Sequence, residues 1–160
     1  MTTEFVIRAA QSEDASNLTD LIRGLGIFAY FESEEEATTM ARIEQYLHKY
    51  LAQENHSIYV VDTEANMIVG YVAVHWLTYL FLPGPEGYIT ELFILSMYRG
   101  KGLGTRLLSE VEIEAKKRGV ARLTLINNNT RESYQREFYK KQGWQAREQM
   151  VSFVKLPAED

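Results

Sequence analysis

The sequence has 160 residues, of which 46% are hydrophobic and 24% are charged. A chain of this length forms one domain of ordinary size and buries about two-thirds of its unfolded surface, so it can hold a core without metal or disulfide support. The composition excludes a disordered or collagen-like chain. A net charge of −5 argues against a nucleic-acid partner, whereas it suits a cationic substrate as well as simple solubility.

The sequence contains no cysteine, which excludes disulfides, thiolate metal sites and a cysteine nucleophile. The three histidines, His48, His56 and His75, have no metal-ligand spacing, so we expect no metal. Met1–Phe5 shows no signal peptide, and no apolar stretch reaches the ~18 residues of a membrane helix. We therefore expect a cytoplasmic protein with no membrane partner.

The first elements in chain order are a strand and two helices. Phe5–Ala9 is typical of a short strand, and apolar residues then recur at helical spacing from 15 to 25, with Gly26 as the stop. Ser33–Glu36 has the pattern of a capping box, which predicts the start of a second helix. The apolar face of that helix would contain Met40, Ile43, Leu47 and Leu51.

The middle of the chain indicates three strands. Ser57–Val61 and Met67–Leu77, joined by a turn at Asp62–Asn66, suggest a hairpin. Pro83–Gly87 is the strongest turn signal, and Tyr88–Leu95 after it is a further strand.

The last third predicts a helix, a strand, a helix and a strand. The apolar residues of the first helix run from Leu103 to Ala115, with a stop at Gly119, and Leu123–Ile126 follows as a buried strand. A second helix contains Tyr134 and Phe138 and ends near Gly143, and Trp144–Leu156 has strand character. The order β-α-α-β-β-β-α-β-α-β predicts one α/β domain over residues 1–160, with a mixed, mostly antiparallel sheet flanked by helices on both faces.

A glycine-rich turn, Arg99-Gly-Lys-Gly-Leu-Gly104, lies directly between a predicted strand and the longest predicted helix. Glycines let the backbone approach a ligand, and the first turn of a helix offers unpaired N–H groups to an anion. Together with Arg99, Lys101 and Arg106, the turn suits a pyrophosphate. The spacing matches neither a P-loop nor the G-x-G-x-x-G dinucleotide fingerprint. A turn of this kind without a ligand is the simpler alternative.

Two motifs resemble those of the GCN5-related N-acetyltransferase (GNAT) family. Arg99-x-x-Gly102-x-Gly104, following Glu91–Leu95, is similar to its acyl-CoA signature. Phe138-Tyr139-Lys-Lys-Gln-Gly143-Trp144 is similar to its downstream Phe-Tyr-x-x-x-Gly-aromatic segment. The motifs stand in the family's order and separation, and the predicted elements cover essentially the whole chain.

The resemblance implies a sheet that splays open between its fourth and fifth strands, with coenzyme A in the opening. Glu132 stands where many members have an asparagine, so Arg131 and the Asn127–Asn129 run are candidates to replace its coenzyme contacts. The implied coenzyme-binding residues are Phe93, Ile94 and Leu95 for the pantetheine, Arg99, Gly100, Lys101, Gly102, Leu103, Gly104 and Thr105 for the pyrophosphate, and Asn128 and Arg131.

Acetyl transfer to an amine needs a base, because an alkylamine with a pKa of about 10.4 is mostly protonated near neutral pH. Glu91, a charged residue in an apolar strand, is our candidate base. The alternative is a glutamate that faces solvent or pairs with a lysine. The resemblance implies that Tyr139 protonates the leaving thiolate and that the amide of Ile94 or a neighbour stabilises the oxyanion. Tyr139 could instead be a core aromatic residue.

Acceptor recognition has two candidate groups. The acids Glu32 and Glu34–Glu36 could attract a cationic acceptor, although acids at a helix N-terminus also stabilise the helix dipole. An aromatic acceptor wall could combine Phe28, Tyr30 and Phe31 with Trp76, Tyr79 and Phe81. Such residues more often form a core or a dimer contact.

The sequence thus predicts an acetyl-CoA-dependent N-acetyltransferase acting by direct attack, without an acyl-enzyme. The favoured acceptor is a small-molecule amine such as a polyamine or amino sugar, with a protein amine as a further option. A non-catalytic acyl-CoA sensor and a nucleotide-binding domain of another kind are the alternatives. Because dimers are common in the family, a homodimer is a candidate assembly.

Overall fold

The computed structural model describes residues 4–157, which form two compact units that divide after Ile126. The first unit holds a five-stranded sheet in the order β1-β2-β3-β4-β5. The first four strands pair antiparallel and β5 pairs parallel with β4, which confirms the mixed, mostly antiparallel sheet. The strands are β1 (Phe5–Ala9), β2 (His56–Thr63), β3 (Ile68–Leu77), β4 (Glu86–Ile94) and β5 (Arg122–Leu125).

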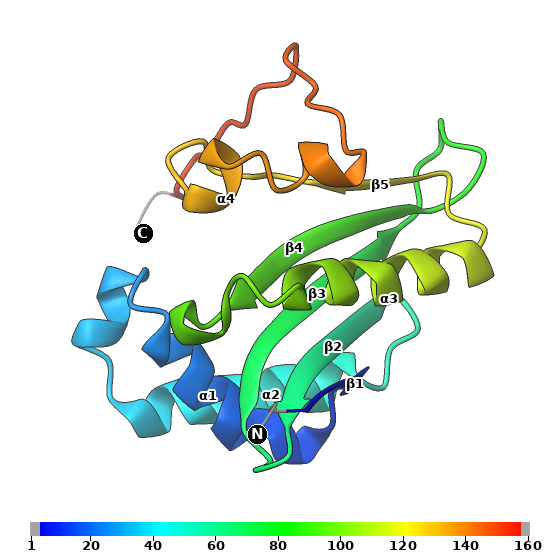
Figure 1. The fold of residues 1–160 in the computed structure, drawn as a ribbon. Helices are drawn as coiled ribbons and strands as arrows, with labels where there is room; N and C mark the ends of the chain where they lie inside the picture. The colour runs from blue at the N-terminus through cyan, green and yellow to red at the C-terminus, as the bar shows by residue number, and fades with distance from the viewer. Residues whose placement is uncertain (1–3, 158–160) are drawn as a thin grey trace. The chain divides into compact units, whose positions relative to one another are not determined.

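Helices cover both faces of this sheet (Figure 1). On one face, α1 (Ala15–Gly24) and α2 (Glu36–Tyr50) bury Leu21 and Leu47 against β2 and β3. On the other, α3 (Leu103–Lys117) contributes a fully buried row of Leu107, Leu108 and Val111. Each such side chain stabilises the fold by about 1.5–3 kcal/mol. β3 is covered from both sides, which is why it is buried along most of its length.

Most of the predicted elements of this unit are confirmed, but the start of the second helix is wrong. α2 begins at Glu36 with Glu35 as its N-cap, so Ser33 does not form a capping box. The Ser33 hydroxyl instead donates to the carbonyl of Tyr30, in a 3-10 turn over Ala29–Glu32. The predicted stops are confirmed, because Gly26 and Gly119 follow α1 and α3 in the left-handed conformation that glycine favours.

The second unit has less regular structure than the sequence predicts. Its helix α4 spans only Glu132–Gln135, and the backbone of Glu137 is then left-handed, with φ of 56°. A 3-10 turn over Lys140–Gln142 follows. The continuous helix expected up to Gly143 is therefore wrong, because one left-handed residue interrupts the series of helical hydrogen bonds.

The strand expected over Trp144–Leu156 is also wrong, since the described part of the second unit contains no strand. Apolar side chains of this segment are exposed to solvent, namely Met150, Val151, Phe153, Val154 and Leu156. The pattern of β-branched and aromatic residues predicts a strand only where a partner strand completes its hydrogen bonds, and here no pairing supplies one.

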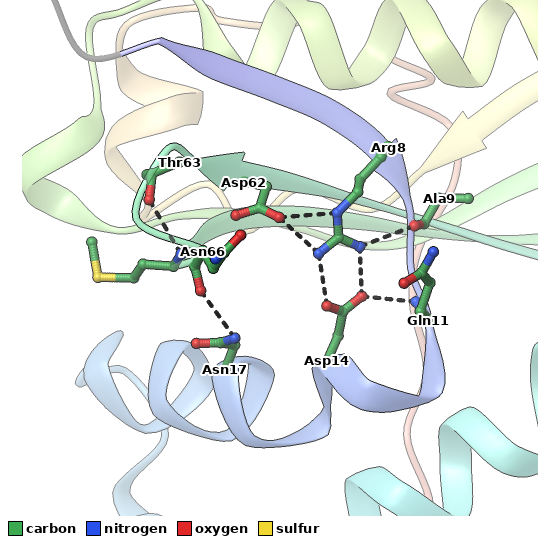
Figure 2. Close-up of polar contacts among 9 residues, drawn as sticks. Arg8, Ala9, Gln11, Asp14, Asn17, Asp62, Thr63 and Asn66 are labelled. Carbon is green, nitrogen blue, oxygen red and sulfur yellow. Dashed lines mark hydrogen bonds and ion pairs between the residues drawn. The ribbon is translucent and has the colours of Figure 1, made fainter.

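An ion cluster joins β1, β2 and the turn before α1 (Figure 2). The guanidinium of Arg8 lies between Asp14 and Asp62 and contacts a carboxylate oxygen of each at 2.8 Å. The side chains of Asp14 and Asp62 are only 7% and 14% exposed. Burial would raise the pKa of Asp14, but hydrogen bonds from Arg8 and from the Gln11 amide outweigh that effect and lower it. One arginine thus neutralises two carboxylates that the fold removes from water.

We expect Arg8→Met to lower the free energy of unfolding by about 2–4 kcal/mol, because it leaves two buried carboxylates without their cation. Urea unfolding followed by circular dichroism measures the change. Because the pKa of Asp14 is lowered in the fold, the part of the stability that it contributes is present at neutral pH and lost as pH falls through that value. This acid-dependent loss should be smaller in the variant.

Arg42→Met is the matched control, since it removes an ion pair with Glu34 in which the arginine is 48% exposed. We expect a clearly smaller loss of stability from this exposed pair. An Arg8→Met protein that unfolds within about 0.5 kcal/mol of the unmodified chain would contradict the prediction.

Candidate functional site

β4 pairs with β3 over nearly its full length but with β5 over only four residues. The β4–β5 register runs from Glu86↔Arg122 to Ile89↔Leu125, whereas β4 continues to Ile94 beside β3. From Thr90 onward, β4 therefore has no partner in β5. This is the opening between the fourth and fifth strands that the resemblance implies, and it lies within the first unit.

The glycine turn connects the end of β4 to α3. A 3-10 turn at Ser96–Tyr98 leads into Gly100 and Gly102, both with φ of 74°, and Gly102 is the N-cap of α3. The first amide to bond back along the helix is that of Arg106, which donates to the Gly102 carbonyl. The amides of the preceding three residues lie in the first turn, where a helix attracts anions. Leu103 is only 2% exposed, so it anchors this turn in the core.

The three cations predicted around this turn have different surroundings. Arg99 donates from Nε to the carbonyl of Ile94 at 3.0 Å, which joins the turn to the end of β4. Lys101 is exposed beside the turn. Arg106 donates to the carbonyl of Phe5 at 2.9 Å and therefore points to β1. Two of the three cations thus remain as candidates for a pyrophosphate site.

Glu91 is half-buried on β4 and accepts a hydrogen bond at Oε1 from the hydroxyl of Tyr71 on β3, at 3.0 Å. Burial raises the pKa of Glu91, and the hydrogen bond from Tyr71 partly offsets this. Burial, with the charge of Glu91, also raises the pKa of Tyr46 on α2 to about 12. Glu91 thus has the raised pKa of a general base, in contact with a tyrosine and not with a lysine.

The predicted aromatic wall separates into two groups. Phe28 packs edge-on against Phe31 and against Phe93 of β4, with ring centroids 5.9 and 5.8 Å apart. Phe93 also contacts Tyr71, the partner of Glu91, and Tyr30 joins the cluster through Phe31. The other three predicted members lie elsewhere: Tyr79 and Phe81 in the β3–β4 loop, and Trp76 beneath Arg118.

One acid of the predicted acceptor group is already paired. Arg42 binds both carboxylate oxygens of Glu34, and Thr39 donates to it as well. Hydrogen bonds from Arg42 and Thr39 lower the pKa of Glu34 to about 2. This carboxylate is therefore already engaged by two side chains of α2, a pairing that neither interpretation of these acids predicted.

Three of the predicted site residues belong to the second unit. Tyr139 contacts Phe138 and Trp144 through its ring, and burial raises its pKa to about 12. The Asn128 side chain accepts from the amide and the hydroxyl of Thr130, which forms the turn before α4. Arg131 is the N-cap of α4.

Sequence reasoning missed Tyr71, although a signal was present. It is a tyrosine within the run 69–74, whose other members are valine, alanine and glycine, and it is only 4% exposed. A buried tyrosine hydroxyl needs a polar partner. That partner could not be identified until the register placed β3 beside β4.

The comparison with known families decides the assignment. The sequence profile of the Acetyltransferase (GNAT) family matches residues 25–144, which include the opening of β4, the glycine turn and Tyr139.

The chain belongs to the GNAT acetyltransferase family.

Relatives and solved structures agree with this membership of the GNAT family. The chain is 32% identical over 77 residues to aminoalkylphosphonate N-acetyltransferase of Salmonella typhimurium, covering 48% of this chain and 49% of that protein. It spans less than half the length of the curated relatives it matches. A transcriptional regulator from Bacillus halodurans has the same fold, with a TM-score of 0.78, 21% identity and coverage of 95% of this chain and 100% of its own. An aminoglycoside N-acetyltransferase in complex with CoA aligns with a TM-score of 0.73 and 14% identity over 97% of both chains.

Within residues 4–157, no helix combines the length and the apolar character that are needed to cross a membrane.

Because burial raises the pKa of Tyr139 to about 12, we expect its phenol to stay mostly protonated at pH 10, roughly the pH at which an ordinary tyrosine is half ionised. NMR of protein labelled with ¹³C at the tyrosine ζ position measures this, with Tyr139→Phe to assign the resonance. Free N-acetyltyrosinamide is the reference. A Tyr139 midpoint equal to that of the reference would contradict the prediction.

Proposed function

We propose that this chain transfers the acetyl group of acetyl-CoA to the primary amine of a small cationic molecule by direct attack. The observation that carries the proposal is Glu91, a carboxylate with raised pKa, on the stretch of β4 that β5 leaves unpaired. The same strand leads directly into the glycine turn at the start of α3. A base and an anion site are thus joined by one short segment.

The residues of the first unit fit coenzyme A. The part of β4 that extends beyond its pairing with β5 offers an edge along which an extended amide chain could pair. The left-handed glycines Gly100 and Gly102 bring the backbone to the start of α3 without side chains in the way. Leu95 has its amide engaged with the carbonyl of Val69, which leaves the amide of Ile94 as our candidate to stabilise negative charge on the acetyl oxygen.

In the proposed reaction the neutral amine forms a bond to the acetyl carbon while the bond from that carbon to sulfur breaks. Glu91 accepts the proton that the amine loses, directly or through one water. Tyr139 donates a hydrogen bond and then its proton to the departing sulfur. With its pKa raised to about 12, it is protonated and available as a donor throughout the neutral range. The absence of cysteine agrees with direct transfer.

The aromatic cluster around Phe28 supports the proposed class of acceptor. Its rings and the hydroxyl-bearing Tyr71 extend from Glu91 toward the loop between α1 and α2. Aromatic faces attract a cation and also accept apolar groups, so this surface suits a small amine whose charged end reaches Glu91. Small primary amines appear in the name of one relative, an aminoalkylphosphonate N-acetyltransferase, and in that of a solved structure with the same fold, an aminoglycoside acetyltransferase. Polyamines and amino sugars remain the preferred candidates, ahead of a protein amine.

Several expectations remain predictions. The family match crosses the division between the two units, and this supports our proposal that residues 1–160 act as one domain. The homodimer and the cytoplasmic location rest on the sequence. The non-catalytic acyl-CoA sensor stays the alternative function, and the presence of both Glu91 and Tyr139 favours the enzyme over it.

We expect coenzyme A to bind in preference to NAD and ATP, which isothermal titration of each ligand measures. Lys101→Glu should weaken coenzyme A several-fold, because it replaces a cation beside the glycine turn by an anion. Lys117→Glu, at the opposite end of the same helix, should leave the affinity close to that of the unmodified chain. Preferential binding of NAD or ATP would reject the coenzyme assignment and favour another kind of nucleotide-binding domain.

We expect acetyl-CoA to release thiol only when an acceptor is supplied, tested with spermidine, tobramycin, 2-aminoethylphosphonate and Nα-acetyl-lysine amide. With the best acceptor, Glu91→Gln should lower kcat/KM on the order of a hundredfold, and Tyr139→Phe should lower kcat by tenfold or more. Glu44→Gln and Tyr134→Phe, which alter exposed residues, are the matched controls. Tight coenzyme A binding without acceptor-dependent thiol would instead support the sensor.

A further inference from the structure

We propose that Tyr71 is a positioning residue, whose hydroxyl holds one carboxylate oxygen of Glu91 so that the other is presented to the proton of the acceptor amine. The inference rests on the proposed role of Glu91 as the base. It adds a residue of β3 to a site whose predicted catalytic and coenzyme-binding members come from β4 and from the segments that follow it.

The register of the sheet places the two side chains within reach. Tyr71 is opposite Phe93, and Ala73 is opposite Glu91, so Tyr71 and Glu91 are diagonal neighbours across β3 and β4. Long side chains bridge such a diagonal on one face of a sheet. Because Ala73 is small, the phenol can extend over it toward the carboxylate. The resulting O–O distance of 3.0 Å is that of a hydrogen bond.

A β-bulge gives Glu91 this orientation. The register shifts between Ala73 and Val74, where Thr90 is the extra residue on β4. Bulges redirect the side chain that follows them and are frequent beside active sites. Here the shift brings Glu91 to the face of the sheet that carries Tyr71, and this is also where β4 loses its pairing with β5. The bulge at Thr90 thus places the Glu91 carboxylate at the point where β4 extends beyond β5.

The phenol of Tyr71 is held rigidly. It is 4% exposed, packs against Phe93 with ring centroids 5.9 Å apart, and belongs to the core beneath α1 and α2. A donor in such a position cannot turn away to water. The carboxylate oxygen bound to it is therefore fixed, and the second oxygen of Glu91 remains for the reaction.

Among the described residues, Tyr71 is the group that stabilises the ionised form of Glu91. The titratable groups that face the pair are Tyr46 from α2 and Tyr30 from the turn before it, both of them tyrosines. Burial raises the pKa of Glu91, and within the described residues the interaction that favours its ionised form is the hydrogen bond from Tyr71. No arginine or lysine of that part of the chain contributes to the shift. Losing the hydroxyl therefore makes the carboxylate harder to ionise.

The test is Tyr71→Phe, which keeps the ring and removes the hydroxyl. Glu91 must be ionised to accept a proton, so the acidic limb of the kcat/KM profile should move to higher pH. At a pH on that limb, kcat/KM should fall on the order of tenfold, and the difference should shrink as pH rises. A purely structural tyrosine would change stability without moving the limb. Tyr59→Phe, which removes a hydroxyl beside Glu110 and Glu114, is the matched control and should leave the limb in place.

A second readout needs no acceptor. In protein labelled with ¹³C at glutamate carboxyls, the resonance assigned through Glu91→Gln should titrate at higher pH in Tyr71→Phe than in the unmodified chain. Incorporating 3-fluorotyrosine at position 71 retains a more acidic hydroxyl, so it should move the titration to lower pH. If circular dichroism shows that Tyr71→Phe does not fold, the shift measured in the 3-fluorotyrosine protein still tests the inference.

The outcomes separate the two proposals. A Glu91 titration that is unchanged by both replacements of Tyr71 overturns the inference, even if Glu91→Gln abolishes transfer. Full activity in Glu91→Gln overturns the proposed function and the inference together, whatever the titration shows. Loss of activity in Glu91→Gln, with opposite shifts from the phenylalanine and fluorotyrosine replacements, supports both.

Discussion

The site depends on one constraint, namely that β4 pairs with β3 along nearly its full length but with β5 only at its start. β5 has only four residues and stops at Leu125, while β4 continues beside β3 to Ile94. A strand edge that extends beyond its neighbour would be a liability in an ordinary sheet, because it can present backbone donors and acceptors to another strand. In this chain it is short, and the glycine turn follows it directly. The coenzyme proposed here would complete that edge.

The proposed base and the proposed acid come from separate places in the sequence, Glu91 from β4 and Tyr139 from the second unit. A base on β4 must be buried enough for its pKa to rise and yet remain ionisable, and burial and hydrogen bonding act on it in opposite directions. Burial raises the pKa of Glu91, and the hydrogen bond from the Tyr71 hydroxyl partly offsets this. Tyr139 experiences burial, which keeps it protonated. Burial thus raises the pKa of both groups, and titratable groups with shifted pKa values are typical of sites that handle protons.

The cores on the two faces of the sheet support this opening. The row of leucines on α3, the core beneath α1 and α2, and the Arg8 cluster tie β1, β2 and β3 to their helices. These elements hold β3 in place, and β3 in turn holds the tyrosine that contacts Glu91. The carboxylate proposed as the base therefore lies on a strand that β3 supports, while the surfaces proposed to meet the acceptor come from the turn between α1 and α2. Enzymes commonly place binding residues on loops that a rigid scaffold holds in position.

The sequence by itself determined the element order of the first unit, the glycine turn and the family motifs, because these depend on local periodicity and on residues adjacent in the chain. It also selected Glu91 and Tyr139 as candidates, since each is a conspicuous residue within a short pattern. Only the tertiary structure decided that Tyr71 contacts Glu91 and that Arg106 donates to the carbonyl of Phe5. It also decided that Glu34 forms an ion pair with Arg42, and that the described residues after Trp144 form no strand. These outcomes depend on strand register and on partners distant in sequence, and local propensity carries no information about either.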